Sequence, residues 1–357
     1  MATPMPLRDQ SLDAFRGTDV LLMIIVNVQG SDAAAFPMLK HAEWNGLTFA
    51  DLVFPIFLLI VGLSTPLALD RPGAVIDWPA ILKRAFWLFM IGVGLSWLIR
   101  PTLEPDLIRW TGVLQRIAIG YLACAAVVIA TRGAGVAAAL AAALLVFHTV
   151  MLLYVGSPPG MAPGMGISGW LDQNFIPGRV LRTTWEPEGI LSTFPSIANG
   201  LIGVAIMRWM QARTVGAMTL GGVGMALILL GVALSPILPI NKNLWTASFA
   251  LVTCGIGIAF WAVLRGLWPK IGRNAVARWT VTLGQAALTL YVVHHILIAI
   301  IVRQMPNGEK LWKISFDALA ATGMNPAVAS LLFAGIAAAI SCAVLPWLRR
   351  RGWILKV

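Results

Sequence analysis

A polar stretch that runs directly into a hydrophobic segment holds the residues best suited to chemistry. The stretch KHAEWNGLTFADLVFP begins at Lys40, and its His41 is the one histidine of four that lies outside an apolar run. An imidazole titrates near neutral pH, so His41 could take a proton from an attacking group or act as a nucleophile. Asp51, about one turn into the next helix, could orient that imidazole or bind substrate, with Trp44 and Asn45 nearby. A solvated surface histidine is the alternative.

A row of polar residues interrupts the first apolar segment, where ionisable side chains are costly unless they face a protein interior or a wet cavity. Asp13 and Arg16 of SLDAFRGTD are three residues apart, so on a helix they share a face and can pair. Asn27 follows about three turns after Arg16 and falls on the same side. Such a row fits a cavity wall, and it also fits a structural ion pair with an interhelical hydrogen bond.

Two further motifs place polar side chains at the start of apolar segments. GVLQRIAIGY contains Gln115 and Arg116, and a guanidinium can bind a carboxylate or phosphate or reach toward a membrane surface. INKNLWTASF contains Lys242 and Trp245, whose indole could stack on a sugar or belong to an interfacial aromatic belt. These residues are therefore candidates for binding polar substrates.

The remaining residues of chemical interest lie inside apolar runs. For His294 and His295 of LYVVHHIL a structural hydrogen bond is favoured over catalysis. Cys124, Cys254 and Cys342 are expected to be small buried hydrophobes. The sequence has no CxxC, no His/Cys cluster and no glycine-rich phosphate loop, so we expect neither a disulfide framework nor a metal site.

Composition identifies the elements that must position these residues. The 357-residue chain is 59% hydrophobic and 11% charged, with a mean hydropathy of +0.83, whereas soluble domains are about half apolar and about a quarter charged. The excess of 15 Trp over 3 Tyr suits membrane interfaces. A net charge of +11 indicates loops that face anionic lipid rather than nucleic-acid binding. We therefore predict an all-α, polytopic membrane protein.

Ten apolar segments are long enough to cross a bilayer, which takes about 20 residues. We expect them at roughly 13–30, 48–69, 80–99, 112–131, 134–155, 190–209, 217–237, 245–264, 280–302 and 327–347. The chain ends and even-numbered loops carry 15 Lys and Arg, and the odd-numbered loops with adjoining segment ends carry 10. By the positive-inside rule both termini are cytoplasmic, and His41 lies on the extracytoplasmic side.

The longest expected extracytoplasmic loop covers residues 156–189. Its many Gly and Pro argue against regular structure. Loops of this length are often functional, and a passive connector is the alternative. We expect residues 1–357 to form one transmembrane domain. The N-terminal residues lack an apolar region followed by a small-residue cleavage site, so the first apolar segment should remain in the mature protein.

Taken in order, these motifs resemble the transmembrane acetyltransferase family of heparan-alpha-glucosaminide N-acetyltransferase and its bacterial relatives. The similar stretches are SLDAFRG, the VN at 26–27, KHAEWNGLTFADLVFPIFLLIVG, GVLQRIAIGY, WEPEGILSTFPSI, INKNLWTASF and LTLYVVHH. They extend from about residue 11 to 295, and HAxWNGxTxADLVFP followed by NKNLW is long and specific.

The resemblance implies an activity and assigns roles to residues. Family members take acetyl from acetyl-CoA on the cytoplasmic side and pass it to the amino group of a glucosamine unit on the far side. The family's active-site histidine corresponds to His41 and its partnering asparagine to Asn27. Glu186 stands where the family usually has Asp, and the large lumenal domain of the lysosomal enzymes is not expected here, so the acceptor should differ from heparan sulfate. The resemblance also implies a possible homodimer.

We therefore predict a bacterial inner-membrane enzyme that transfers acetyl from acetyl-CoA, its co-substrate, to the amino group of glucosamine or a glucosaminide. His41 would accept the amine proton or carry the acetyl group itself, and Asn27 would hold the carbonyl oxygen. The binding candidates are Asn45, Asp51, Trp44, Glu188, Lys242 and Trp245 for the acceptor, and Arg16, Arg116 and Gln115 for the donor. A transporter or flippase for a sugar or anion, and an acyltransferase for another cell-envelope sugar, are the alternatives.

Overall fold

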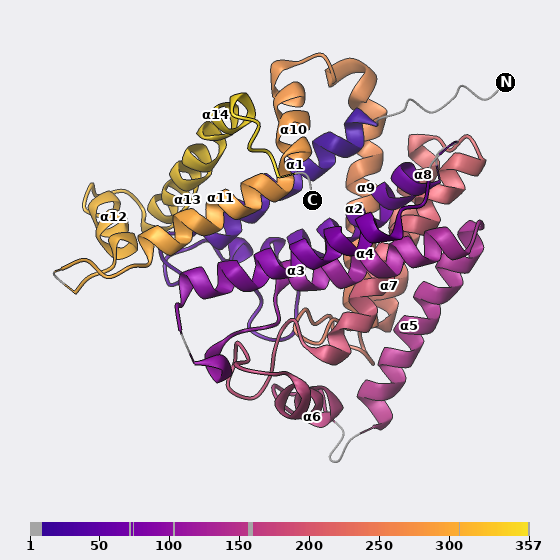
Figure 1. Cartoon of the computed structure of the whole chain (residues 1–357), viewed down its shortest axis with the longest axis horizontal. Helices are drawn as coiled ribbons and strands as arrows, with labels where there is room; N and C mark the ends of the chain where they lie inside the picture. Colours follow the sequence, from indigo (N-terminus) through magenta and orange to yellow (C-terminus); the bar gives the residue numbers. More distant parts are fainter. Residues whose placement is uncertain are drawn as a thin grey trace.

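The computed structural model describes residues 9–70, 73, 75–102, 104–155, 160–306 and 308–355. Within these residues every regular element is a helix, apart from isolated bridges at Arg109–Gly178 and Gln304–Lys310. The helices, shown in Figure 1, are α1 (Gln10–Asn27), η1 (Pro37–Leu39), α2 (Phe49–Leu69), α3 (Trp78–Ile99), η2 (Pro105–Leu107), α4 (Val113–Ala130), α5 (Ala134–Tyr154), α6 (Gly166–Phe175), α7 (Ile190–Ala212), α8 (Ala217–Leu234), α9 (Ala247–Ile271), α10 (Ala275–Gln285), α11 (Ala287–Ile301), α12 (Leu311–Ala320), α13 (Pro326–Ala343) and α14 (Leu345–Arg350).

Apolar helices of membrane-spanning length confirm the predicted polytopic bundle. In the described part of the chain eight spans qualify by length and composition, namely α2, α3, α4, α5, α7, α8, α9 and the Pro326–Arg350 segment of α13 and α14. The bent pair α10 and α11 brings the number to as many as nine, whereas the sequence predicted ten. The difference is α1, which forms a helix where expected but carries Asp13, Arg16 and Asp19 within its 18 residues.

The predicted segment 280–302 is not one straight helix. It divides between α10 and α11, which meet at an angle of 80°. The residue between them, Ala286, has the non-helical torsion angles φ −120° and ψ 23°. Irregular backbone at membrane depth is tolerated where it is buried in protein or lines a cavity. Leu283, Ala286 and Ala287 around the bend are buried.

Helix α2 lies at the centre of the bundle, where it packs against α1, α4, α7 and α9. A Cβ atom at Gly62 would lie 1.8 Å from the carbonyl oxygen of Gly200, so the glycines allow α2 and α7 to cross closely. The neighbouring helices α9 and α8 differ in burial, because 72% of the α9 span is buried, against 17% of the α8 span. Polar residues on α2 therefore face protein and not lipid.

The expected pairing within α1 is present. Arg16 Nη1 lies 3.2 Å from Asp13 Oδ1, and Arg16 Nη2 donates to Ser64 Oγ on α2 at 2.6 Å. Helix α1 also approaches α10 closely, because a Cβ at Gly17 would lie 1.8 Å from the Thr280 carbonyl oxygen of α10. The first helix is thus packed between α2 and α10 with its charged residues inside the bundle.

The connection from α5 to α7 contains a helix, which corrects the expectation that 156–189 lacks regular structure. Helix α6 spans ten residues and packs against α5 and α7. It lies at the lower edge of the molecule in Figure 1. Gly and Pro are concentrated before and after this helix, so they punctuate the loop without preventing a helix between them. Residues 156–159 lie outside the described part of the chain.

Candidate active site

A cavity of about 350 Å³, here called the His41 cavity, lies where α1 ends and α2 begins. Its apolar walls come mainly from α2, α3 and α4. Its polar lining consists of Asn27, His41, Ser96, Arg109, Gln115, Glu188, Lys242, Tyr291 and His295. Four of the predicted site residues for the acceptor and the chemistry, His41, Asn27, Glu188 and Lys242, therefore share one cavity.

His41 is held by a carboxylate that also caps the following helix. Asp51, in the first turn of α2, accepts hydrogen bonds at Oδ2 from the backbone nitrogens of Ala42 and Thr48, each at 3.1 Å. With Thr48 it forms a capping box. Its other oxygen, Oδ1, lies 2.8 Å from His41 Nδ1. Asp51 is fully buried, whereas the His41 side chain is 49% exposed.

This contact selects the tautomer of the neutral imidazole. An ionised carboxylate only accepts hydrogen bonds, so Nδ1 of His41 carries the proton that it shares with Asp51. The lone pair of a neutral ring is then on Nε2. An imidazole in this state can accept a proton from an attacking group or attack a carbonyl carbon itself.

Lys242 lies against the same ring. Its Nζ is 2.9 Å from Nδ1 and 3.3 Å from Nε2 of His41, and 3.4 Å from Asp51 Oδ1. Because Nζ is close to both ring nitrogens, it lies against the face of the imidazole and not along the lone pair of either nitrogen. Burial lowers the pKa of Lys242, and the charges of Asp51 and Glu188 oppose that effect.

Trp44 and Asn45 hold loops together beside His41. Asn45 Oδ1 accepts a hydrogen bond from Asn241 Nδ2 at 3.0 Å, which ties the His41 loop to the loop that carries Lys242. Trp44 Nε1 donates to the Met161 carbonyl oxygen at 2.7 Å, and its ring meets Trp185 edge-on with centroids 5.0 Å apart. Both residues therefore position the loop in this structure.

Trp245 is buried, so neither interpretation offered by the sequence describes it. Its side chain is 1% exposed, and Nε1 donates to Asn199 Oδ1 at 3.1 Å. The ring meets Phe54 edge-on at 5.1 Å. Among the described residues it is the one non-glycine with a positive φ, at 55°. This left-handed residue comes three positions after Lys242, which lines the His41 cavity.

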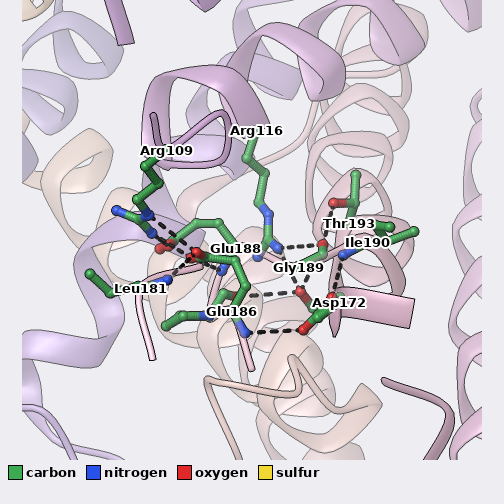
Figure 2. Close-up of polar contacts among 11 residues, drawn as sticks. Arg109, Arg116, Asp172, Leu181, Glu186, Glu188, Gly189, Ile190 and Thr193 are labelled. Carbon is green, nitrogen blue, oxygen red and sulfur yellow. Dashed lines mark hydrogen bonds and ion pairs between the residues drawn. The ribbon is translucent and has the colours of Figure 1, made fainter. Parts of the chain in front are cut away.

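Arg109 and two glutamates of WEPEG form a buried charged cluster on the wall of the His41 cavity (Figure 2). Arg109 Nε donates to Glu186 Oε2 at 3.1 Å, Nη2 pairs with Glu186 Oε1, and Nη2 also donates to Glu188 Oε2 at 2.6 Å. The Glu188 side chain is 11% exposed and lines the cavity. Burial opposes ionisation of Glu188, but the nearby Arg109 and Arg116 outweigh it and lower its pKa.

The cluster shows what Glu186 contacts at the position where the family usually has Asp. The Glu186 side chain is fully buried. Its carboxylate pairs with Arg109 and accepts a hydrogen bond from the Leu181 backbone nitrogen at 2.8 Å. Glu186 therefore anchors the loop, and Glu188 is the glutamate that faces the cavity. Arg109 is not among the site residues predicted from the sequence, although two acidic residues that fold into an apolar environment require a cation.

Asp172 of α6 also stabilises the loop that contains Glu186 and Glu188. Its carboxylate accepts hydrogen bonds from the backbone nitrogens of Glu186 and Ile190, each at 3.1 Å (Figure 2). Burial raises the pKa of Asp172 to about 6, against the opposing effect of these two hydrogen bonds.

This pKa predicts a pH-dependent contribution to stability. The folded state binds the Asp172 proton more tightly than the unfolded state, whose value is near 3.8. The stabilisation is therefore complete below about pH 4 and is lost as pH rises through about 6. The unfolding temperature of the wild type relative to Asp172→Asn, measured from pH 4 to 7, should fall across this range. Parallel curves for the two proteins would contradict the assignment.

Arg116 and Gln115, predicted to bind the donor, lie at the His41 end of the bundle. Arg116 is 2% exposed, donates through Nη2 to the Gly189 carbonyl oxygen at 3.0 Å and lies 5.1 Å from the Trp245 ring. Arg116 is therefore buried and connects the start of α4 to the residue before α7. The Gln115 side chain lines the His41 cavity and occupies the space beside Gly92, where a Cβ would lie 2.3 Å from Gln115 Oε1.

A second cavity of about 380 Å³, here called the Arg16 cavity, lies at the other end of the helices. Its polar lining includes Arg16, Ser64, Thr65, Arg84, Tyr121 and Gln285. Phe57, Ile117 and Tyr291 line both cavities, so the two meet back to back across a wall of three side chains. Arg16 is the one predicted donor-binding residue in this second cavity.

The paired histidines have different environments. His294 is fully buried, whereas His295 lines the His41 cavity. His295 Nδ1 lies 2.9 Å from the Tyr291 carbonyl oxygen, and its ring stacks on the Tyr291 ring with centroids 4.2 Å apart. Since a carbonyl oxygen only accepts, Nδ1 of His295 carries a proton and its Nε2 is an acceptor.

The fold and site define a multi-pass membrane protein in which a histidine–carboxylate pair lies beside two adjoining cavities. The family model described as heparan-alpha-glucosaminide N-acetyltransferase, catalytic, matches residues 8–235, more than half of the chain. The chain therefore belongs to this family. Lys242, Tyr291 and His295 lie beyond the matched residues, although they line the same cavities.

Two curated relatives extend the similarity toward the end of the chain. The human heparan-alpha-glucosaminide N-acetyltransferase is 29% identical across 82% of this chain and 53% of its own length. The mouse protein of the same name is 27% identical across 81% of this chain and 54% of its own length. The chain thus spans about half the length of the curated relatives it matches.

Proposed function

We propose that this protein transfers acetyl from acetyl-CoA on the cytoplasmic side of a bacterial inner membrane to the amino group of glucosamine or a glucosaminide on the other side. Both chain ends would then be cytoplasmic. Family membership supports the acetyl transfer, and the names of the relatives support a glucosaminide acceptor. The observation that carries the proposal is the back-to-back arrangement of the Arg16 and His41 cavities.

The two cavities suit a donor with a polar end and a long arm. Acetyl-CoA is too polar to cross lipid, so the protein must enclose the part of it that enters the membrane. The Arg16 cavity offers the guanidinium groups of Arg16 and Arg84 toward the charged end of such a donor. The arm would pass Phe57, Ile117 and Tyr291 and present the thioester in the His41 cavity.

His41 supplies the chemistry in two routes that use the same atoms. In direct transfer, the acceptor nitrogen attacks the acetyl carbon while Nε2 of His41 takes the amine proton. The carbon–sulfur bond breaks, the carbon–nitrogen bond forms, and the CoA thiolate then recovers that proton. In the second route Nε2 attacks the acetyl carbon, the carbon–sulfur bond breaks and the CoA thiolate is released, so that His41 carries the acetyl group. The amine then attacks the same carbon, the carbon–Nε2 bond breaks, and the amine proton passes through Nε2 to the thiolate. Asp51 holds Nδ1–H in both routes and stabilises the imidazolium.

Neighbouring residues orient the acceptor and the carbonyl. Glu188, kept ionised by Arg109, faces the cavity and can bind hydroxyl or ammonium groups of an amino sugar. Asn27 at the end of α1 lines the same cavity and would hold the carbonyl oxygen of the thioester. Both roles place the sugar between α1 and the WEPEG loop.

The direct test uses protein purified in detergent, isotope-labelled acetyl-CoA and glucosamine. Labelled N-acetylglucosamine would support the proposal. Consumption of acetyl-CoA only when another cell-envelope amino sugar is supplied would change the acceptor. Movement of sugar across a membrane without any acetyl transfer would instead indicate a transporter.

A substitution at the wall shared by the cavities should affect the donor selectively. Ile117→Trp adds bulk at a side chain that lines both cavities, so it narrows the route that a donor arm would take. We expect the KM for acetyl-CoA to rise about tenfold or more, with the KM for glucosamine little changed. Ile119→Trp, on an exposed face of the same helix, is the matched control. Equal effects on both KM values would contradict a donor path at this wall.

A further inference from the structure

Lys242 has no role in the proton transfers just described, yet it is the cation nearest to the reactive nitrogen. Its Nζ lies 3.3 Å from Nε2 of His41, and Nε2 is the atom that must meet the acceptor amine or the acetyl carbon. The acetyl carbonyl oxygen is bonded to the carbon under attack. When the reaction takes place at Nε2, this oxygen comes within hydrogen-bonding range of the ammonium group.

The ammonium group also has donors to spare. Lysine carries three N–H bonds and no acceptor. Asp51 Oδ1, at 3.4 Å, and Nε2 of His41, at 3.3 Å, account for at most two of them. His41 Nδ1 is 2.9 Å away, but its own proton is directed at Asp51, so it offers no lone pair to the lysine. At least one N–H is therefore free to point into the cavity that Lys242 lines.

The backbone around Lys242 fixes the position of this group. Asn241 bonds to Asn45 at 3.0 Å and accepts from the Leu244 nitrogen at 2.8 Å. The Trp245 nitrogen donates to the Lys242 carbonyl oxygen at 3.1 Å within the strained turn. The Lys242 side chain is 16% exposed, so little solvent competes for its hydrogen bonds. A preorganised donor in such a site needs no rearrangement when charge develops.

We propose that the Lys242 ammonium is a catalytic residue that stabilises the negative charge on the acetyl carbonyl oxygen during transfer. This inference rests on the proposed acetyl transfer. As the amine nitrogen bonds to the acetyl carbon, the second electron pair of the carbonyl moves onto oxygen, where Lys242 and Asn27 donate hydrogen bonds. When that pair returns, the carbon–sulfur bond breaks and the CoA thiolate leaves. Lys242 and Asn27 would donate to the same oxygen if His41 first carries the acetyl group.

Steady-state kinetics with acetyl-CoA and glucosamine provide the first test. Removal of one donor to an oxyanion typically costs about 10²–10³ in rate, so Lys242→Met should lower kcat by about that factor with both KM values within about threefold. Lys242→Arg, which keeps the charge, should recover part of the loss. Lys40→Met is the control that should retain wild-type rates, because Lys40 is one residue from His41 and its ammonium donates to the Ala33 carbonyl oxygen.

A second measurement separates this role from one that acts only through His41. Hydroxylamine is a strong nucleophile that needs little help from a base, so its acetylation can be followed with and without His41. Lys242→Met should lower this rate by a similar factor in the wild-type and His41→Ala backgrounds. A loss seen only when His41 is present would show that Lys242 merely positions the imidazole, and it would overturn the proposal.

The outcomes distinguish this inference from the proposed function. Wild-type kcat in Lys242→Met overturns the inference and leaves acetyl transfer intact. No acetyl transfer by the wild type to glucosamine or hydroxylamine overturns both. Unfolding temperatures of the variants are measured in parallel, and a variant that unfolds early is replaced by Lys242→Gln, which retains a polar side chain of similar reach.

Discussion

His41→Ala is expected to lower kcat for acetyl transfer to glucosamine by about 10²–10⁴-fold, the range that a positioned general acid–base group contributes. The loss follows from the geometry, because His41 presents Nε2 to the cavity while Asp51 holds Nδ1 at 2.8 Å. The unfolding temperature should change little, since the side chain is 49% exposed. The rate is measured with labelled acetyl-CoA and saturating glucosamine.

Glu43→Gln is the matched control for this variant. Glu43 is an exposed residue in the same loop and should retain wild-type rates when its charge is removed. Equal product from His41→Ala and wild type would remove His41 from the mechanism. The chemistry would then have to be reassigned among the other ionisable groups that line the cavity, which are Arg109, Glu188, Lys242, Tyr291 and His295.

Arg109→Met should produce the largest loss of stability. Arg109 pairs with both Glu186 and Glu188, and their charges outweigh burial and raise its pKa. Removal of the guanidinium leaves two carboxylates in the protein interior, and breaking a buried pair in this way costs about 3–5 kcal/mol. The unfolding temperature in detergent should therefore fall clearly. Since Glu188 faces the cavity, acetyl transfer should also decline in the protein that remains folded.

Arg182→Met provides the comparison for Arg109→Met. Arg182 lies in the same loop but is exposed, so loss of its charge should leave the unfolding temperature nearly unchanged. Similar unfolding temperatures for Arg109→Met and Arg182→Met would contradict the account of Arg109 as the cation that supports the WEPEG loop.

Local spacing predicted the contacts that depend on it. The three-residue separation of Asp13 and Arg16 led to a pair that the structure shows at 3.2 Å. The placement of Asp51 one turn into α2 led to a carboxylate that reaches back to His41. In both cases one helical turn or one cap joins the two residues, so a periodicity argument is sufficient.

Contacts between distant parts of the chain could not be predicted in this way. Arg109 and Glu186 are 77 residues apart and meet only because the loop before α7 folds back against α4. The sequence suggested that Trp245 stacks on a sugar or belongs to an interfacial belt, whereas the residue lies in a left-handed turn at φ 55° and its side chain is buried in the core. The division between α10 and α11 falls at Ala286, two residues after Gly284, but an isolated glycine in a helical pattern does not by itself predict a bend of 80°. Tertiary packing decided all three.

The two cavities also depend on that packing. Phe57, Ile117 and Tyr291 come from α2, α4 and α11, and no motif relates them in sequence. Their meeting point is nonetheless the feature that distinguishes transfer across a membrane from acetyl transfer on one face. The proposed function therefore depends on two separate compartments as much as on His41.

The most direct measurement uses sealed vesicles that contain the purified protein, with glucosamine trapped inside and labelled acetyl-CoA added only outside. Molecules whose Arg16 cavity faces outward should produce labelled N-acetylglucosamine inside the vesicles, and His41→Ala vesicles should produce far less. Product that forms only when glucosamine and acetyl-CoA are present on the same side would contradict transfer through the adjoining cavities.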